Sequence, residues 1–154
     1  RMTDQSKEKG KIIQADEARE QEGATLENFG YTEKLEEVVW KISEREQTID
    51  GQVLALEIYL KESGRGAEKE EAFLCLAQRY EENDRIDDAA EICRRGRKVL
   101  PQSKLLALTY LEILWNVEGL EPEMKAQVTK GILTELPEIQ EQEQFKILKR
   151  AYGF

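Results

Sequence analysis

The sequence predicts an all-α protein built from successive pairs of amphipathic helices. Of its 154 residues, 36% are charged and 40% are hydrophobic, and the abundant Glu, Lys, Gln, Leu and Ala favour helix over strand. Apolar residues recur at spacings of three and four in segments of helical length, and short polar turns separate these segments. This length is enough for one domain with a continuous core.

Residues 1–30 are predicted to be a flexible or partly helical tail. Large apolar residues are almost absent from this stretch after Ile12 and Ile13. The segment around them can form one or two amphipathic turns, but it has too little apolar surface to fold alone. Arg1 precedes Met2, which indicates either an expression remnant before a native start or a fragment of a longer protein.

The domain is predicted to span residues 31–154, and its first helix pair covers about 32–62. Thr32 is a candidate N-cap for a helix that runs to about Thr48. Residues 49–51 then read as a turn. A second apolar segment follows, and the glycines of the Ser-Gly-Arg-Gly run at 63–66 end it.

Two further pairs are predicted over residues 69–100 and 103–136. Each has helical apolar spacing on both sides of a polar turn, and Pro122 opens the last helix of the third pair. Residues 138–152 form a final amphipathic segment, which we expect to cap the array.

Residues 70–103 place specific residue types at fixed positions of a 34-residue window. Small Ala77 and Ala89 suit the close crossing of two helices, Gly96 suits close approach to the next unit, and Pro101 ends the second helix. The agreeing positions are Phe73, Leu76, Ala77, Tyr80, Ile86, Ala89, Cys93, Gly96 and Pro101. This segment therefore resembles a tetratricopeptide repeat.

The flanking copies are degenerate. Polar Ser43 falls where Ala77 stands, and the spacing from Pro101 to Pro137 is 36 residues. Terminal repeats commonly depart from the consensus, because they face solvent or a cap. An unrelated helical bundle, with Ala, Leu and Tyr as ordinary core residues, is the alternative.

The resemblance implies an antiparallel helix-pair solenoid, a right-handed α-α superhelix of about three pairs plus the capping helix. The first helices of the pairs would line a concave groove that binds an extended or helical peptide. The groove residues expected on this basis are Trp40, Glu44, Leu74, Gln78, Glu81, Leu108, Glu112 and Trp115. Such a groove suits a partner segment with apolar anchors and basic residues between them. Either tryptophan can instead pack between repeats.

Family members that bind acidic chaperone tails use Lys, Arg and Asn on these helices. This sequence has Glu and Gln there, so we do not expect that ligand. The one concentrated basic run, Arg94, Arg95, Arg97 and Lys98, ends a helix. There it complements the helix dipole and can pair with Glu81, Glu82 or Glu91.

Composition excludes several function classes. The net charge of −9 disfavours nucleic acid, and no run of apolar residues is long enough to span a membrane. The chain has no histidine, and Cys75 and Cys93 form no C-x-x-C pair, so we expect no metal, no cofactor and no enzyme activity. No secretory signal is recognisable, which favours the cytoplasm.

We therefore expect an adaptor or scaffold that binds another protein. Two alternatives remain open. The groove can be filled by the chain's own terminal helix, by its tail or by a second copy, which would make the module a homodimerisation element. The chain can also be a non-catalytic regulatory segment of a larger enzyme or transcription regulator.

Overall fold

The computed structural model describes residues 33–154, and this part of the chain contains helices and turns without any strand. The all-α prediction is confirmed for these residues. The predicted tail and the predicted cap at Thr32 lie outside them. The helices are α1 (Leu35–Arg45), α2 (Ile49–Glu62), η4 (Gly66–Glu68), α3 (Lys69–Glu82), α4 (Ile86–Val99), α5 (Lys104–Asn116), α6 (Pro122–Glu135), η5 (Pro137–Glu141) and α7 (Glu143–Tyr152), of which η4 and η5 are 3₁₀-helices.

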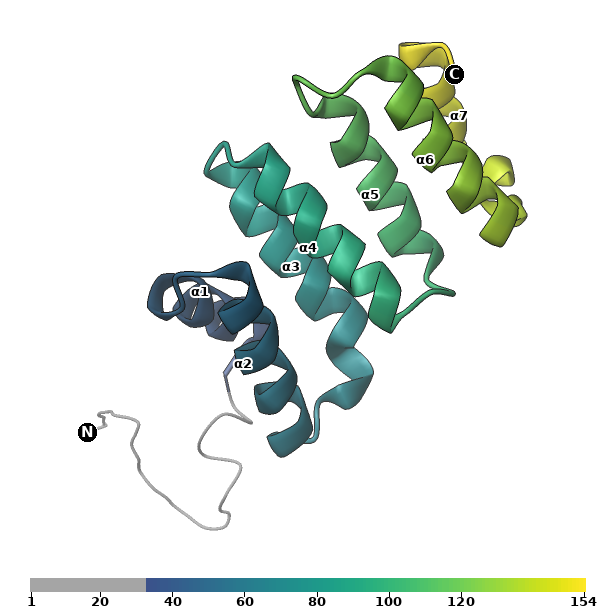
Figure 1. The fold of residues 1–154 in the computed structure, drawn as a ribbon. Coiled ribbons are helices and arrows are strands. Elements are labelled where there is room, and N and C mark those ends of the chain that lie inside the picture. The colour runs from purple at the N-terminus through teal and green to yellow at the C-terminus, as the bar shows by residue number, and fades with distance from the viewer. Residues whose placement is uncertain (1–32) are drawn as a thin grey trace, which may run out of the picture.

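The helices follow one another across the molecule in chain order, from α1 and α2 at one end to α7 at the other (Figure 1). The contact between α3 and α4 is the most extensive, and α4 also packs on α5. Helix α1 packs on α3 as well as on α2, so first helices of neighbouring predicted pairs touch. None of the helices between residues 33 and 154 has the length and apolar character needed to cross a membrane.

The turn between α1 and α2 lies earlier than the sequence predicts. Helix α1 ends at Arg45 instead of about Thr48, and residues 49–51, predicted as a turn, form the first turn of α2. The reason is a side-chain cap: the Thr48 Oγ1 accepts a hydrogen bond from the Gly51 backbone N–H at 3.0 Å. Glycine has a low helix propensity, but the first turn of α2 is also held by the Thr48 cap, so Gly51 is tolerated here.

The capping segment is also different from the prediction of one helix over 138–152. It consists of the 3₁₀-helix η5 and the separate α7, which meet at Gln142 in extended conformation. Pro137 begins η5, and Ile139 within it is fully buried. Because the bend is fixed by this buried isoleucine, α7 can turn back and contact α5.

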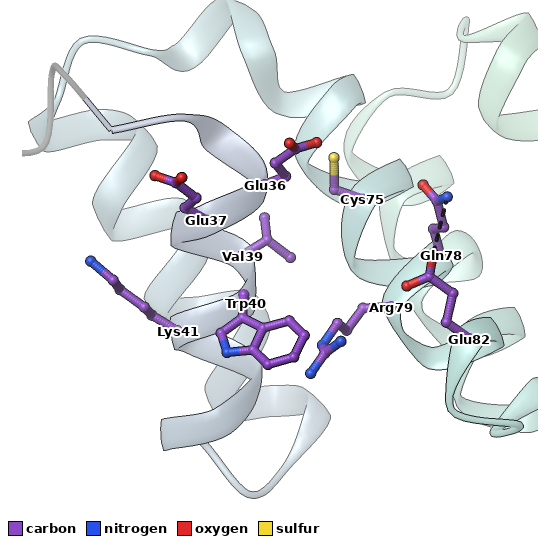
Figure 2. A pocket seen from close by; sticks show the side chains of 9 residues that line it. All are labelled: Glu36, Glu37, Val39, Trp40, Lys41, Cys75, Gln78, Arg79 and Glu82. Carbon is purple, nitrogen blue, oxygen red and sulfur yellow. Dashed lines mark hydrogen bonds between the residues drawn. The ribbon is translucent and has the colours of Figure 1, made fainter.

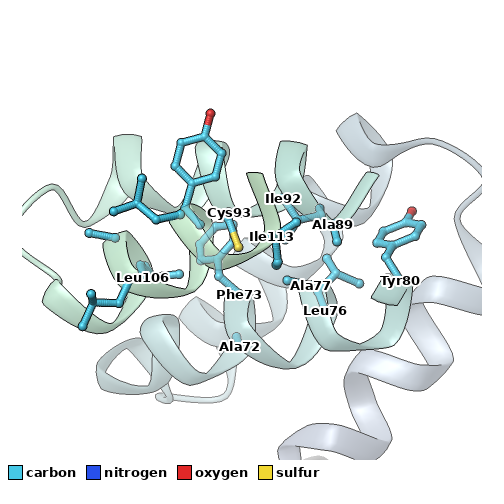
Figure 3. Packing of buried hydrophobic residues seen from close by; sticks show 14 of the residues in the cluster. Ala72, Phe73, Leu76, Ala77, Tyr80, Ala89, Ile92, Cys93, Leu106 and Ile113 are labelled. Carbon is cyan, nitrogen blue, oxygen red and sulfur yellow. The ribbon is translucent and has the colours of Figure 1, made fainter. Parts of the chain in front are cut away.

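Buried apolar residues of α3, α4 and α5 pack together in one part of the core (Figure 3). Ala77 and Ala89 are fully buried, as their predicted place at the helix crossing requires. Gly96 has a different role from the predicted approach to the next pair. A Cβ added to it would lie 3.0 Å from Cγ of Phe73, in the preceding helix, so glycine makes room for this ring.

A buried polar link joins α3 to the first pair. The Tyr80 hydroxyl donates to Oε1 of Gln52 at 2.6 Å, and Nε2 of Gln52 donates to the Glu46 carbonyl at 2.8 Å. These bonds satisfy the only buried amide side chain of the described residues. They hold the α1–α2 turn against α3 and thereby fix how α1 lies beside it.

Candidate protein-binding groove

A groove of about 500 Å³ lies between α1 and α3 (Figure 2). Buried Val39 and half-buried Cys75 lie at its base, and Trp40 forms one wall. The lining surface is mostly apolar, whereas its rim is charged. The lining residues are Glu36, Glu37, Val39, Trp40, Lys41, Cys75, Gln78, Arg79 and Glu82.

Trp40 is the central residue of this wall. Its side chain is 49% exposed, although apolar neighbours on the same helix are buried. The guanidinium of Arg79 lies over one face of the indole, 3.1 Å from the ring centroid. Arg79 also donates to Glu44 at 3.4 Å, so Glu44, Arg79 and Trp40 form one chain of contacts between α1 and α3.

The two cations of the groove already face carboxylates. Arg79 pairs with Glu44, and Lys41 pairs with Glu33. Within residues 33–154, no ion pair engages Glu36 or Glu37, which project from α1 at the same rim. The Gln78 amide donates to Glu82 at 3.4 Å on the opposite side. Among the described residues, the rim therefore carries carboxylates without an ion-pair partner around an apolar base.

Cys75 is not an activated thiol. Burial, followed by the nearby carboxylates of Glu71 and Glu36, raises its pKa. Burial raises the pKa of Cys93 to about 12, with a smaller contribution from Glu81. Both thiols stay protonated at neutral pH, and a protonated thiol is a poor nucleophile and a poor metal ligand.

The structure brings three of the predicted groove residues together. Trp40 and Gln78 line the groove, and Glu44 reaches its edge through Arg79. Leu74 is half-buried and packs against the core instead. Glu81 is also half-buried, and its pKa is raised by burial and then by the carboxylates of Glu112 and Glu82.

Leu108 does not line a surface, contrary to its predicted place in the groove. Its side chain is only 4% exposed. Helix α5 carries apolar residues on nearly every side and packs on α3, α4, α6 and α7. Because several faces of this helix are buried, its apolar spacing does not reveal which side faces a groove.

Trp115 packs against other residues of this chain, which is the alternative that the sequence left open for either tryptophan. Its ring stacks on Tyr152 and Phe154, with centroid distances of 5.6 and 4.8 Å. Its Nε1 donates to Oγ1 of Thr129 at 3.0 Å. Glu112, one turn earlier, is exposed and accepts a hydrogen bond from Gln144 of α7. The C-terminal segment thus covers the part of the predicted groove that Glu112 and Trp115 of α5 were expected to form.

Helical spacing did not identify Arg79, Cys75 or Glu36 as groove residues. Arg79 directly follows Gln78, and its long side chain extends from α3 back to Trp40. No spacing rule identifies such a contact between helices. Glu36 lies one turn before Trp40, so a wider stripe on α1 would have included it.

Three of the four residues of the basic run, Arg94, Arg95 and Arg97, form ion pairs within the fold. Arg94 and Arg95 bind Glu91, Arg95 also binds Asp50, and Arg97 binds Glu135. The predicted pairing with Glu91 is confirmed, whereas Glu81 and Glu82 make no ion pair with the run in the described part of the chain. The pKa of Glu91 is lowered, chiefly by its hydrogen bond with Arg94.

No group of acidic, cysteine or histidine side chains within residues 33–154 is arranged to hold a metal ion. Comparison with models of known protein families gives no match, and searches of curated proteins and of solved structures give no significant match either. The tetratricopeptide resemblance therefore stays a prediction that rests on the residue pattern of 70–103.

Proposed function

We propose that this domain is a protein-binding module whose groove between α1 and α3 holds a basic partner segment with an apolar anchor. The observation that carries the proposal is Trp40, which is half-exposed beside an apolar base, while Glu36 and Glu37 form no ion pair with any other residue of 33–154. A tryptophan at the edge of a pocket is typical of binding hot spots. The free carboxylates select a cationic segment by charge complementarity.

Helix packing supports a helix-pair solenoid of the tetratricopeptide type as the framework for this groove. In such a solenoid, first helices of successive pairs lie side by side, as α1 and α3 do here. The groove would then hold its ligand across two neighbouring pairs. Because Leu108 is buried and Trp115 is covered, the proposed binding surface is shorter than the sequence predicts.

We propose a binding role and not a catalytic one. The sequence has no histidine, and the pKa of the groove thiol of Cys75 is raised. The groove therefore has neither an imidazole base nor an activated thiol nucleophile.

Selection from a random peptide library displayed on phage tests the proposal. We expect the full chain to enrich peptides with Lys or Arg near a large apolar residue, and binding to weaken as salt rises. Trp40→Gln should remove this binding. Leu105→Gln is the matched control, because Leu105 is similarly exposed at 45% but lies on α5 outside the groove.

Each library outcome is informative. Enrichment of basic peptides that depends on Trp40 and not on Leu105 supports the groove. Enrichment of acidic peptides, equal enrichment by the Trp40 variant, or no enrichment at all would overturn the proposal. Circular dichroism of both variants verifies that they keep the helical content of the parent.

A further inference from the structure

Helix α2 has apolar side chains on its outer face that stay exposed in the described part of the chain. Leu56 and Leu60 bury one side of this helix in the core. On the outside, Leu54 and Ile58 are 60% and 46% exposed and lie one helical turn apart. Among the large exposed apolar side chains of residues 33–154, no other two are separated by four positions on one helix. The adjacent pair forms a patch, whereas isolated exposed apolar residues are ordinary.

The charges at the two ends of this face are opposite. Asp50 lies in the first turn of α2, and Lys61 lies in its last turn. With 3.6 residues per turn, both fall on the same side of the helix as Leu54 and Ile58. Asp50 pairs with Arg95, yet its side chain is 81% exposed and can accept a second cation.

This pattern is self-complementary in one orientation only. In an antiparallel pair of α2 helices centred between Leu54 and Ile58, each Leu54 meets the Ile58 of the other copy. Lys61 then lies opposite position 51, about 1.5 Å along the axis from Asp50 of the second copy. A parallel pair would instead place Lys61 against Lys61. The helix dipoles also favour the antiparallel arrangement.

We infer that two copies of this chain associate through the outer faces of α2 as an antiparallel, two-fold symmetric dimer. No residue of α2 lines the groove between α1 and α3, so the inference does not rest on the proposed function. Helix α2 lies at the end of the array opposite α7, where a second copy can approach (Figure 1). A single helix pair is a small interface, so association is weak and depends on concentration.

Sedimentation equilibrium of the full chain over about a hundredfold range of concentration tests the dimer. We expect the mean mass to rise from 17.8 kDa towards twice that value. Leu54→Lys and Ile58→Lys should each weaken association at least about tenfold. Both can pair with acidic residues one turn away, so the monomer should keep its helix. Leu105→Lys, on an equally exposed leucine of α5, should dimerise as the parent does.

Charge reversal tests the orientation. Asp50→Lys brings two lysines together across the axis, Lys61→Asp brings two aspartates together, and each should weaken the dimer. The double variant restores opposite charges and should recover most of the association. A chain that stays monomeric at every concentration, a Leu105 variant as weak as those on α2, or a double variant no better than the single ones would overturn the inference.

Discussion

The two tryptophans lie on different helices, α1 and α5, and have opposite surroundings. Trp115 is enclosed by Tyr152 and Phe154 and donates a hydrogen bond to Thr129. Trp40 is half-exposed, with the Arg79 guanidinium on one face. Both residues occupy first helices of predicted pairs. Their difference arises because the C-terminal segment returns over α5, whereas Arg79 is the principal cover of Trp40 within residues 33–154.

This comparison separates a structural tryptophan from a candidate binding residue. An aromatic ring packed on two others contributes to stability through its buried area and ring contacts. A ring that is left half-exposed contributes less to stability and can contribute to binding. The two roles predict different responses to the same substitution.

The largest expected effect is that of Trp115→Ala. We expect it to lower the free energy of unfolding by about 3 kcal/mol, because both ring contacts and the bond to Thr129 are lost. Trp40→Ala should cost less than about 1 kcal/mol, mainly the exposed contact with Arg79. Urea unfolding followed by circular dichroism measures both. Equal losses would contradict the distinction between the two tryptophans.

The α3–α4 region shows how far the sequence predicts the fold. Small Ala77 and Ala89, the polar turn before Ile86 and the proline at 101 fix two helices and their close crossing by local sterics. The bend at Gln142 was not predictable in the same way. It depends on the burial of Ile139 in η5, which packs on α6 and α7, and helical spacing does not report this packing.

The candidate site was predicted only in part, for a related reason. Helical spacing placed Trp40 and Gln78 on the groove side because α1 and α3 each have a distinct polar face. It failed for Leu108, since α5 is rich in apolar residues and is buried on several sides. Arg79 was missed because its role depends on a contact with Trp40, which lies on another helix and 39 positions earlier in the sequence.

A smaller effect is expected from Phe154→Ala, which removes one side of the enclosure of Trp115. We expect a loss of about 1–2 kcal/mol, because Phe154 contacts both Trp115 and Phe145. In a Trp40→Phe background, Trp115 is the only tryptophan, and its emission should shift to the red with stronger quenching by acrylamide. Ile147→Ala, an exposed change on α7, should leave the emission unaltered. An unshifted emission in the Phe154 variant would show that Trp115 is enclosed by other residues.

The smallest effect concerns Glu81, which lies where the two regions meet. Glu112 approaches it from α5 and is itself bonded to Gln144 of α7. The pKa of Glu81 is raised above its ordinary value of 4.5, so the folded state binds its proton more tightly than the unfolded state does. This group therefore contributes stability that is present below that ordinary pKa and is lost as pH rises through the raised pKa.

Glu81→Gln should remove this dependence. At pH 7 we expect the variant to be more stable than the parent by less than about 1 kcal/mol, because solvent screens a partly exposed carboxylate. Below about pH 3 the two should be equally stable, since Glu81 is then neutral in both folded and unfolded parent. Urea unfolding at both pH values measures the difference, with exposed Glu141→Gln as the control. A difference that is the same at both pH values would mean that the substitution acts through packing and not through the charge of this carboxylate.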